Sequence, residues 1–371
     1  MQVLFIALGL VGLGLVMVYS SSSVLGRVRF ADSGFFLERQ GVRAVVGILL
    51  MMLVSRVPPD LWARAGRPML LLAMGLLVLV LLVGEGPAHR WLRLPVLVTR
   101  LSFQPAEFAR LALVIYLADV LARQERLMHD VRNGLVPRLL VVGVVVVLIA
   151  AQPDLGTAAA VTMVALTMLW LGGARTGHLL TATLACLPLL ALSMYLSRYQ
   201  LSRITFLWRG GNYQVDQALV ALGSGGWFGV GLGNSLQKQQ FLPEPHTDFV
   251  FAFVGEELGL AGTIGVLAMF VWLTIQGLRI AANAANQHLY LLANGITAMI
   301  ATYVLLNVGV VTGILPTTGL PLPFISYGGT ALIGNLAGVG ILLGIARTGS
   351  GGSTVLPPGP VTRRHMVRRF K

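Results

Sequence analysis

The chain consists of long apolar runs separated by short segments that carry charges, prolines or glycines. A transmembrane helix needs about 20 mostly apolar residues, because the hydrocarbon core of a bilayer is about 30 Å thick. Runs that approach this length predict helices at residues 3–20, 41–55, 68–84, 106–122, 137–151, 157–172, 178–197, 249–278, 289–312 and 327–346. We therefore expect an all-α, polytopic integral membrane protein of about ten transmembrane helices.

Composition supports this fold class. Of the 371 residues, 56% are hydrophobic and 11% are charged, whereas a water-soluble domain carries roughly 25% charged residues. The apolar N-terminus lacks a basic leader and a small-residue cleavage site, so we expect a retained first helix. Cys186 is the only cysteine, which excludes an intramolecular disulfide and a cysteine-based metal site.

The domain organisation follows from the same pattern. Residues 1–348 are expected to form one transmembrane domain, with a large extracytoplasmic loop at about residues 198–248 between the seventh and eighth predicted helices. Long structured loops are often functional. Residues 349–371 are rich in glycine, proline and arginine, and we expect a flexible basic cytoplasmic tail there.

The net charge of +13 comes almost entirely from arginine. A small excess of basic residues on one side of the predicted helices favours a cytoplasmic N-terminus. Many arginines still fall on the outer side, and two interpretations stay open. They contact anionic lipid headgroups, or they bind the phosphates of an anionic ligand, which arginine holds with two hydrogen bonds.

Two carboxylates begin predicted helices after a Gln-Pro step. Glu107 follows Gln104-Pro105, and Asp154 follows Gln152-Pro153. Arg110 lies three residues after Glu107, so the two side chains share a helix face and can pair. The alternative is that they are headgroup-level residues without a chemical role.

Asp248 ends the segment Pro-Glu-Pro-His-Thr-Asp, immediately before the predicted helix at residues 249–278. It suits a helix N-cap, because aspartate accepts hydrogen bonds from the first free helix amides. It also suits a general base at the membrane surface. His246 suggests a metal pair or a triad with Asp248, although no recognisable nucleophile accompanies them. Glu257 follows within the same helix and is expected to pair with an outer arginine or to support the site.

The segment between the last two predicted helices, residues 316–330, is rich in proline, glycine and hydroxyl groups and contains Ser326. Irregular backbone at membrane depth persists where it is buried in protein or lines a wet cavity. We therefore expect this segment to form part of a cavity.

Together these segments resemble the SEDS family, the shape, elongation, division and sporulation proteins. The similar segments, in family order over nearly the whole chain, are Arg90-Trp-Leu, Phe103-Gln-Pro-Ala-Glu-Phe, Gln152-Pro-Asp-Leu-Gly-Thr, Tyr213-Gln-Val-Asp-Gln-Ala-Leu, Gly223-Ser-Gly-Gly-Trp-Phe-Gly-Val-Gly, Pro243-Glu-Pro-His-Thr-Asp-Phe-Val-Phe, Glu256-Glu-Leu-Gly-Leu and Pro321-Leu-Pro-Phe-Ile-Ser-Tyr-Gly-Gly-Thr. Likeness is greatest to the rod-shape branch of the family.

The resemblance implies ten spans, two cytoplasmic termini and a location in the bacterial plasma membrane with the active site facing outward. It implies a peptidoglycan glycosyltransferase that polymerises lipid II during cell-wall elongation and cell-shape maintenance. Its expected partners are a class B penicillin-binding protein acting as transpeptidase, other membrane proteins of the rod complex and membrane lipids, and no nucleic acid.

The resemblance also carries residue roles. It makes Asp248 the essential carboxylate and implies functional roles for Trp91, Glu107 and Arg110. The chain departs from the family pattern at Ala106, where serine is common, and at Arg110, where lysine is typical. An arginine that often precedes the Phe-Gln-Pro segment is replaced by Ser102, so Arg100 is not assigned a phosphate contact.

In the mechanism that we expect, Asp248 deprotonates the acceptor sugar hydroxyl, which displaces the lipid diphosphate from the donor with inversion. Arg110 is the first candidate to stabilise the leaving diphosphate, and an Mg²⁺ or Mn²⁺ ion near Asp248 is an open alternative. No dedicated metal cage is evident. The expected catalytic residues are Asp248, Glu107 and Arg110; the substrate-binding residues are Trp91, Arg93, Arg203, Arg209, His246 and Ser326; and the supporting residues are Asp154, Glu257 and Gln104.

Two other functions stay open at this point. A flippase for lipid II would also use outward arginines and a broken helix, but it should carry ionisable groups near the middle of the bilayer. A noncatalytic scaffold that activates its penicillin-binding partner would not need the Asp248 carboxylate.

Overall fold

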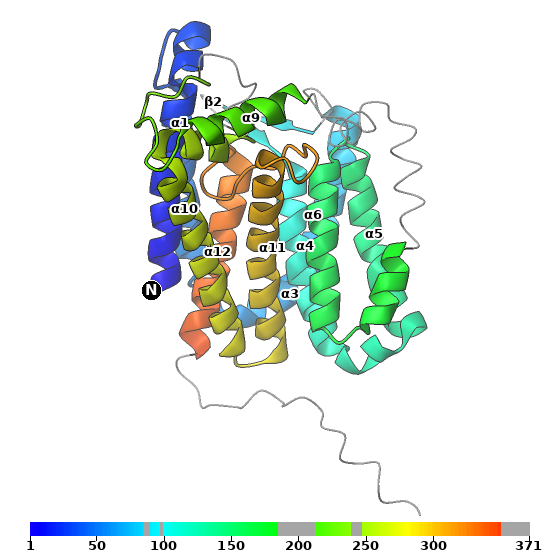
Figure 1. Ribbon diagram of the computed structural model, residues 1–371. Helices are drawn as coiled ribbons and strands as arrows, with labels where there is room; N and C mark the ends of the chain where they lie inside the picture. The colour runs from blue at the N-terminus through cyan, green and yellow to red at the C-terminus, as the bar shows by residue number, and fades with distance from the viewer. Residues whose placement is uncertain (85–89, 97–98, 185–211, 239–246, 350–371) are drawn as a thin grey trace, which may run out of the picture.

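The computed structural model describes residues 1–84, 90–96, 99–184, 212–238 and 247–349. The apolar runs in this part form long helices packed side by side (Figure 1). The helices are α1 (Gln2–Phe30), α2 (Phe35–Val54), α3 (Pro59–Val83), α4 (Pro105–Arg123), α5 (Val136–Ala150), α6 (Leu155–Leu171), α9 (Tyr213–Ser224), α10 (Val250–Ala282), α11 (Gln287–Val311) and α12 (Gly329–Gly349). Two short helical turns, η1 (Glu125–His129) and η2 (Val131–Leu135), join α4 to α5.

The predicted helices are confirmed wherever the structure describes them. Residues 176–184 are helical and begin the predicted helix at 178–197, whose remainder lies outside the described residues. In the described part, six helices are long and apolar enough to cross a membrane, and α6 is a shorter apolar helix. α2 and α4 fall outside this group because each carries several charged side chains. The chain is therefore a polytopic, almost entirely helical membrane protein.

α11 is the central helix of the bundle. Of its apolar window, 78% is buried, against 28% for α3. α11 packs against α4, α6 and α10, so its polar side chains face protein and not lipid. α9 lies across one end of the bundle, and the N-terminus and the end of α12 lie toward the opposite end (Figure 1). We call these the α9 end and the opposite end.

A β-hairpin between α3 and α4 was not predicted. β1 (Leu92–Val96) pairs antiparallel with β2 (Thr99–Phe103), and Leu92 lies opposite Phe103. The segment alternates apolar and polar residues, which is the strand period, but it is short and contains Pro95. The all-α class holds for the bundle, and the hairpin adds a small two-stranded sheet at the α9 end (Figure 1).

The segment between α11 and α12 has an irregular backbone that is buried in protein, as predicted. Leu320, Phe324 and Ser326 are all at most 4% exposed. Gly14 of α1 allows the close approach, because a Cβ there would lie 2.5 Å from the Phe324 carbonyl oxygen. The absent side chain thus lets α1 pack directly against this backbone.

α10 is broken at Gly259, whose φ of 68° lies in the left-handed region. The loop after α9 packs into the break, where the amide of Leu260 donates to the carbonyl of Gly226 at 2.8 Å. A Cβ on Gly259 would lie 2.4 Å from the Gly229 amide nitrogen. Only glycine satisfies both constraints at this position.

Gly259→Ala is therefore expected to destabilise the protein by about 2 kcal/mol or more, because it adds backbone strain and a clash with the loop. Thermal unfolding of the detergent-solubilised protein measures the effect. Gly265→Ala is the matched control on the same helix, since a Cβ on Gly265 would have no other atom within 4 Å. Equal thermal stability of the two variants would contradict this explanation of the break.

Candidate active site

Asp248 lies two residues before the first residue of the long helix α10, which begins at the α9 end of the bundle (Figure 1). Its side chain is partly exposed, whereas the next two residues, Phe249 and Val250, are buried. Gly319 of the α11–α12 segment is close, because a Cβ on it would lie 3.5 Å from Asp248 Oδ2. The carboxylate therefore faces the irregular segment that the sequence predicted as part of a cavity.

The N-cap interpretation of Asp248 is wrong. The N-cap of α10 is Phe249, and its side chain makes no capping hydrogen bond. The helix therefore begins one residue later than an aspartate N-cap at position 248 would require.

The main chain of Asp248 is fixed by Asn307 of α11. Asn307 Nδ2 donates to the carbonyl oxygens of Asp248 and of Leu320, both at 2.8 Å. Asn307 is 1% exposed, so these hydrogen bonds are shielded from water. One amide thus joins the start of α10 to the α11–α12 segment and sets the position of the Asp248 carboxylate.

Replacing Asn307 by alanine should lower turnover about 10-fold or more, since a displacement of about 1 Å at a catalytic group has large effects on rate. The measurement is the rate of product formation by the purified variant. Asn294→Ala is the matched control, because Asn294 also lies on α11 but donates to Tyr290 of its own helix. Similar losses of turnover in both variants would show that Asn307 does not position Asp248.

A buried ion pair forms the second part of the site. Glu107 Oε2 lies 2.7 Å from Arg110 Nη2, and each side chain is 2% exposed. The pairing predicted from their spacing is confirmed. Arg110 Nη2 also donates to Asn335 Oδ1 of α12 at 2.9 Å. The pair therefore joins α4 to α12 below the α9 end.

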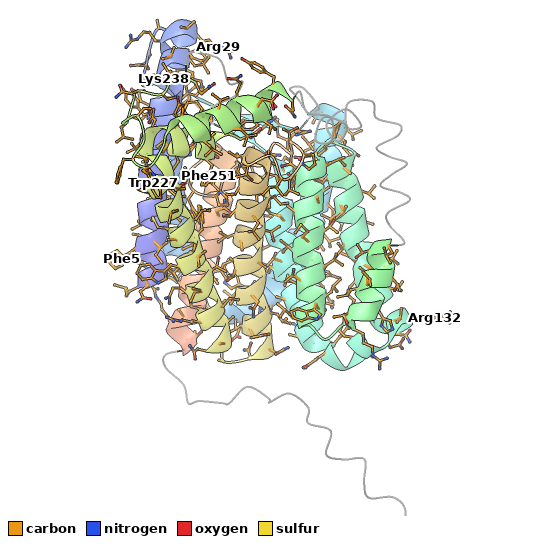
Figure 2. The ribbon with its side chains drawn as sticks, in the orientation of Figure 1. Phe5, Arg29, Arg132, Trp227, Lys238 and Phe251 are labelled. Carbon is orange, nitrogen blue, oxygen red and sulfur yellow. The ribbon has the colours of Figure 1, made fainter. Side chains whose placement is uncertain are left out.

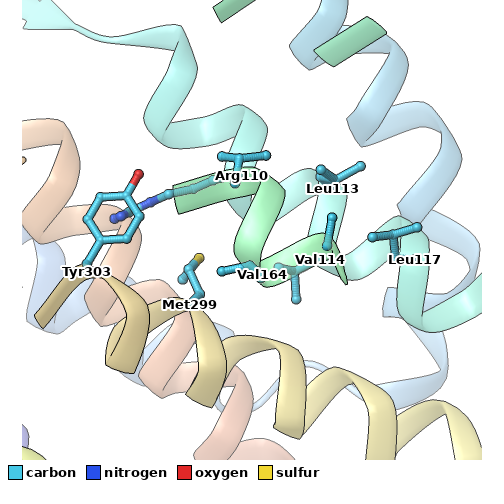
Figure 3. A pocket seen from close by; sticks show the side chains of 9 residues that line it. Arg110, Leu113, Val114, Leu117, Val164, Met299 and Tyr303 are labelled. Carbon is cyan, nitrogen blue, oxygen red and sulfur yellow. The ribbon is translucent and has the colours of Figure 1, made fainter. Parts of the chain in front are cut away.

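Arg110 is held further by an aromatic ring. Its Cζ lies 4.1 Å from the ring centroid of Tyr303, a cation–π contact (Figure 3). A small cavity of ≈10 Å³, about the size that one water molecule needs, lies beside both side chains. Arg110 Nε and Nη1 have no hydrogen-bond partner among the described residues. The cavity can therefore hold one buried water beside the guanidinium.

α11 links the two parts of the site. Tyr303 and Asn307 are four residues apart on α11, which puts them on one helix face about 6 Å apart along its axis. Tyr303 contacts Arg110, and Asn307 holds the main chain of Asp248. The structure thereby brings Asp248 and the Glu107–Arg110 pair to the same end of the bundle.

A third contact network fixes the start of α4. Asp154 caps α6, accepting from the Thr157 amide at 3.1 Å, and it also accepts from Gln104 Nε2 at 3.2 Å. Arg90 lies 3.7 Å from Asp154 and donates to the main-chain carbonyls of Gln152 and Pro153. The two Gln-Pro steps therefore meet in space, and Gln104 and Asp154 hold elements together as expected of supporting residues.

The comparisons with known proteins decide the family. The FtsW/RodA/SpoVE family, described as "Cell cycle protein", matches residues 1–350. These are the SEDS proteins that the motifs resemble. The chain is a SEDS protein.

Two curated relatives align with this SEDS protein over nearly their whole length. "Probable peptidoglycan glycosyltransferase FtsW" of Geobacter sp. (strain M18) is 38% identical over 93% of this chain and 96% of its own. "Stage V sporulation protein E" of Bacillus subtilis (strain 168) is 39% identical over 92% of this chain and 95% of its own.

Solved structures share the fold of this SEDS protein. A chain from "Structural coordination of polymerization and crosslinking by a peptidoglycan synthase complex" has a TM-score of 0.77 at 28% identity, covering 94% of this chain and 98% of its own. The rod shape determining protein RodA of Thermus thermophilus has a TM-score of 0.68 at 29% identity, covering 93% of this chain and 95% of its own.

Two predicted residues of this SEDS protein have structural contacts. Ser326 Oγ accepts from the Leu322 amide at 2.8 Å and is buried, so the hydroxyl shapes the irregular segment. Glu257 is 0% exposed and accepts from Ser20 Oγ at 2.5 Å. No arginine among the described residues pairs with Glu257, and Arg203 and Arg209 lie outside these residues, so the expected arginine pair stays a prediction. Through the hydrogen bond from Ser20, Glu257 joins α10 to α1.

The remaining predicted residues have fewer described contacts. Trp91 directly precedes β1 and is partly buried, and Arg93 lies in β1 opposite Ser102. Arg203, Arg209 and His246 lie outside the described residues. Among the described residues no group of three His, Cys, Asp or Glu side chains is arranged to hold a metal ion, and the ion near Asp248 stays a prediction.

The sequence prediction missed Tyr303, Asn307 and Asn335. Each is a polar residue inside an apolar helix, and each is at most 2% exposed. Polar side chains within transmembrane helices tend to line functional cavities or bind one another. A polar residue within an apolar run is therefore the sequence signal that identifies all three.

Proposed function

We propose that this SEDS protein polymerises lipid II into glycan strands at the outer face of the bacterial plasma membrane. Peptidoglycan glycosyltransferase is the class that the name of its Geobacter relative states. The observation that carries the proposal is the gathering of Asp248 and the Glu107–Arg110 pair at one end of a membrane-embedded bundle. A substrate with an apolar tail in the bilayer and sugars in water reacts at such an end.

In this mechanism the Asp248 carboxylate accepts the proton of the acceptor sugar 4-hydroxyl. The hydroxyl oxygen then forms a bond to the anomeric carbon of the donor sugar. The bond from that carbon to the lipid diphosphate breaks, and the diphosphate leaves with the electron pair. One displacement inverts the anomeric centre and needs no covalent enzyme intermediate. Asp248 suits this role because it is partly exposed and fixed through its main chain.

Arg110 is the proposed cation for the leaving diphosphate. Its buried guanidinium lies at the same end of the bundle as Asp248, where its positive charge acts on the leaving group through protein of low dielectric constant. Glu107, Tyr303 and Asn335 hold the guanidinium in one orientation, so the cation needs no rearrangement as charge develops. Arg93, Arg203 and Arg209 remain proposed diphosphate contacts, and Trp91, His246 and Ser326 remain proposed substrate contacts. A Mg²⁺ or Mn²⁺ ion near Asp248 also remains proposed.

The proposed orientation puts the α9 end outside and both termini in the cytoplasm. Arg132 lies at the opposite end, and Arg29 and Lys238 lie at the α9 end (Figure 2). Basic residues are therefore found at both ends, and the cytoplasmic assignment rests on the small excess at the opposite end and on the tail of residues 349–371. We infer that residues 1–348 form one domain, which agrees with the extent of the family match.

A class B penicillin-binding protein is the proposed transpeptidase partner. One structural relative belongs to a peptidoglycan synthase complex with structural coordination of polymerisation and crosslinking. Cell-wall elongation and shape maintenance, with other rod-complex proteins, remain the proposed cellular role. The structural likeness to RodA supports that role, whereas one curated relative is named for sporulation. Expression in cells depleted of their own rod-shape enzyme tests it, and restored rod shape is expected.

The activity test uses the purified chain with its partner in detergent micelles supplied with lipid II, with the products resolved on a gel. Glycan strands are expected. Micelles have no separated compartments, so a flippase would leave lipid II unconverted in them, although it would move labelled lipid II across the membrane of liposomes. A noncatalytic scaffold would also leave lipid II unconverted in micelles. Unconverted lipid II would therefore contradict the proposed polymerase activity.

A further inference from the structure

A second cleft opens at the opposite end of the bundle, far from Asp248. It has a volume of ≈580 Å³ and lies between α3, α4 and the η2–α5 region. Arg67 and Arg138 line it together with apolar side chains that include Leu71, Met74 and Val141. Ligand sites in proteins commonly have volumes of about 300 to 1,000 Å³. The cleft is therefore large enough for part of a lipid.

The side chains of the cleft are arranged from polar to apolar. Arg67, Leu71 and Met74 are four and three residues apart on α3, so they lie along one helix face that runs from the opposite end toward the bilayer centre. Arg138 and Val141 follow the same order on α5. Leu71 is 65% exposed, so the cleft is open to the surrounding membrane. This arrangement fits an amphiphile with a charged head and an apolar chain.

Arg138 supplies an independent indication of a ligand. It is 5% exposed, and its Nη1 donates to the carbonyls of Asn133 and Gly134, both at 2.7 Å. Its Nε has no hydrogen-bond partner among the described residues. A buried charge is costly unless it is paired. Neither Arg138 nor Arg67 forms an ion pair with a described carboxylate, so the buried charge of Arg138 lacks a counter-ion within the described chain, and the exposed Arg67 adds a second unpaired guanidinium at the cleft.

The nearby carboxylate of Asp130 is already engaged. It accepts from the Asn133 side chain at 2.7 Å and from the Arg132 amide at 2.9 Å. These hydrogen bonds, that of the Asn133 side chain first, hold the pKa of Asp130 below its usual value, and the group caps η2. No described residue that lines the cleft is acidic. The cleft therefore favours an anionic ligand.

We propose that this cleft binds an anionic phospholipid from the membrane leaflet at the opposite end. Its phosphate contacts the guanidinium groups of Arg67 and Arg138, which suit phosphate oxygens. One acyl chain follows Leu71, Met74 and Val141 toward the bilayer centre. Basic pockets between transmembrane helices on the cytoplasmic side recognise lipid headgroups in this way. The bound lipid would fix α3 and α5 against α4.

Native mass spectrometry of the full chain, released from detergent with added phosphatidylglycerol, tests the proposal. The wild type is expected to retain phosphatidylglycerol in preference to phosphatidylethanolamine. Arg67→Gln should weaken retention about fivefold, since each arginine near a lipid phosphate contributes about 1 kcal/mol. Arg67 is exposed, so folding should persist. Arg64→Gln is the matched control on the same helix, because Arg64 is exposed and does not line the cleft.

Three outcomes would overturn the proposal. Equal retention by Arg67→Gln and Arg64→Gln would mean that the cleft does not hold the phosphate. Equal competition by inorganic phosphate would identify a free anion and not a lipid as the ligand. Displacement of phosphatidylglycerol by lipid II at lower concentration would make the cleft part of the substrate path.

Discussion

Asp248→Asn is expected to slow glycan-strand synthesis at least about 100-fold, because a positioned general base contributes about 10² to 10⁴ to the rate. Asparagine has nearly the same shape but cannot take the proton of the acceptor hydroxyl. The fold should be kept, because the hydrogen bond from Asn307 is to the main-chain carbonyl of residue 248 and survives the substitution. Strand synthesis is measured on gels, and folding is measured by thermal unfolding in detergent.

Asp216→Asn is the matched control for this prediction. Asp216 is an exposed carboxylate on α9, at the same end of the bundle. Its removal changes the local charge by the same amount but should leave the rate within about twofold, because exposed charges contribute little. If Asp248→Asn were as active as Asp216→Asn, Asp248 would not be the general base. The scaffold alternative predicts this result.

Arg110→Met should destabilise the protein by about 3 to 5 kcal/mol, because it leaves the Glu107 carboxylate buried without its partner. The Tm in detergent should fall accordingly, and strand synthesis should be lost. The matched control is Arg64→Gln, on the neighbouring helix α3. Arg64 is exposed and forms no ion pair with a described carboxylate, so this change should cost about 1 kcal/mol or less.

The double variant Glu107→Gln/Arg110→Met separates structure from chemistry. Removing both charges should restore much of the lost stability, because no uncompensated charge stays buried. Strand synthesis should stay absent, because the proposed cation for the leaving diphosphate is missing. A double variant that polymerises lipid II at the wild-type rate would remove Arg110 from the mechanism.

The helices could be predicted from the sequence because the bilayer makes the pattern simple. An apolar run of sufficient length must satisfy its backbone internally, and a helix does so within the segment itself. The start of α4 after Gln104-Pro105 and the Glu107–Arg110 pair also depend only on local spacing. The hairpin could not be predicted from local spacing, because the pairing of a strand depends on a second segment. The run from Leu92 to Phe103 is also short.

The assembled site could not be predicted in the same way. Asn335 lies 225 residues from Arg110, and Asn307 lies 59 residues from Asp248. No spacing rule connects residues so far apart, because their contact is set by how the helices pack. The N-cap prediction for Asp248 was wrong for a related reason. α10 begins one residue later, and the main chain of Asp248 is held by Asn307 of another helix.

Whether Asp248 performs chemistry on bound lipid II is tested most directly by the rate at which lipid diphosphate is released with enzyme in excess. Wild type and Asp248→Asn are compared after each has been shown to bind the same amount of lipid II. We expect release by the wild type and release at least about 100-fold slower by Asp248→Asn. Equal rates of release at equal binding would contradict a catalytic role for Asp248.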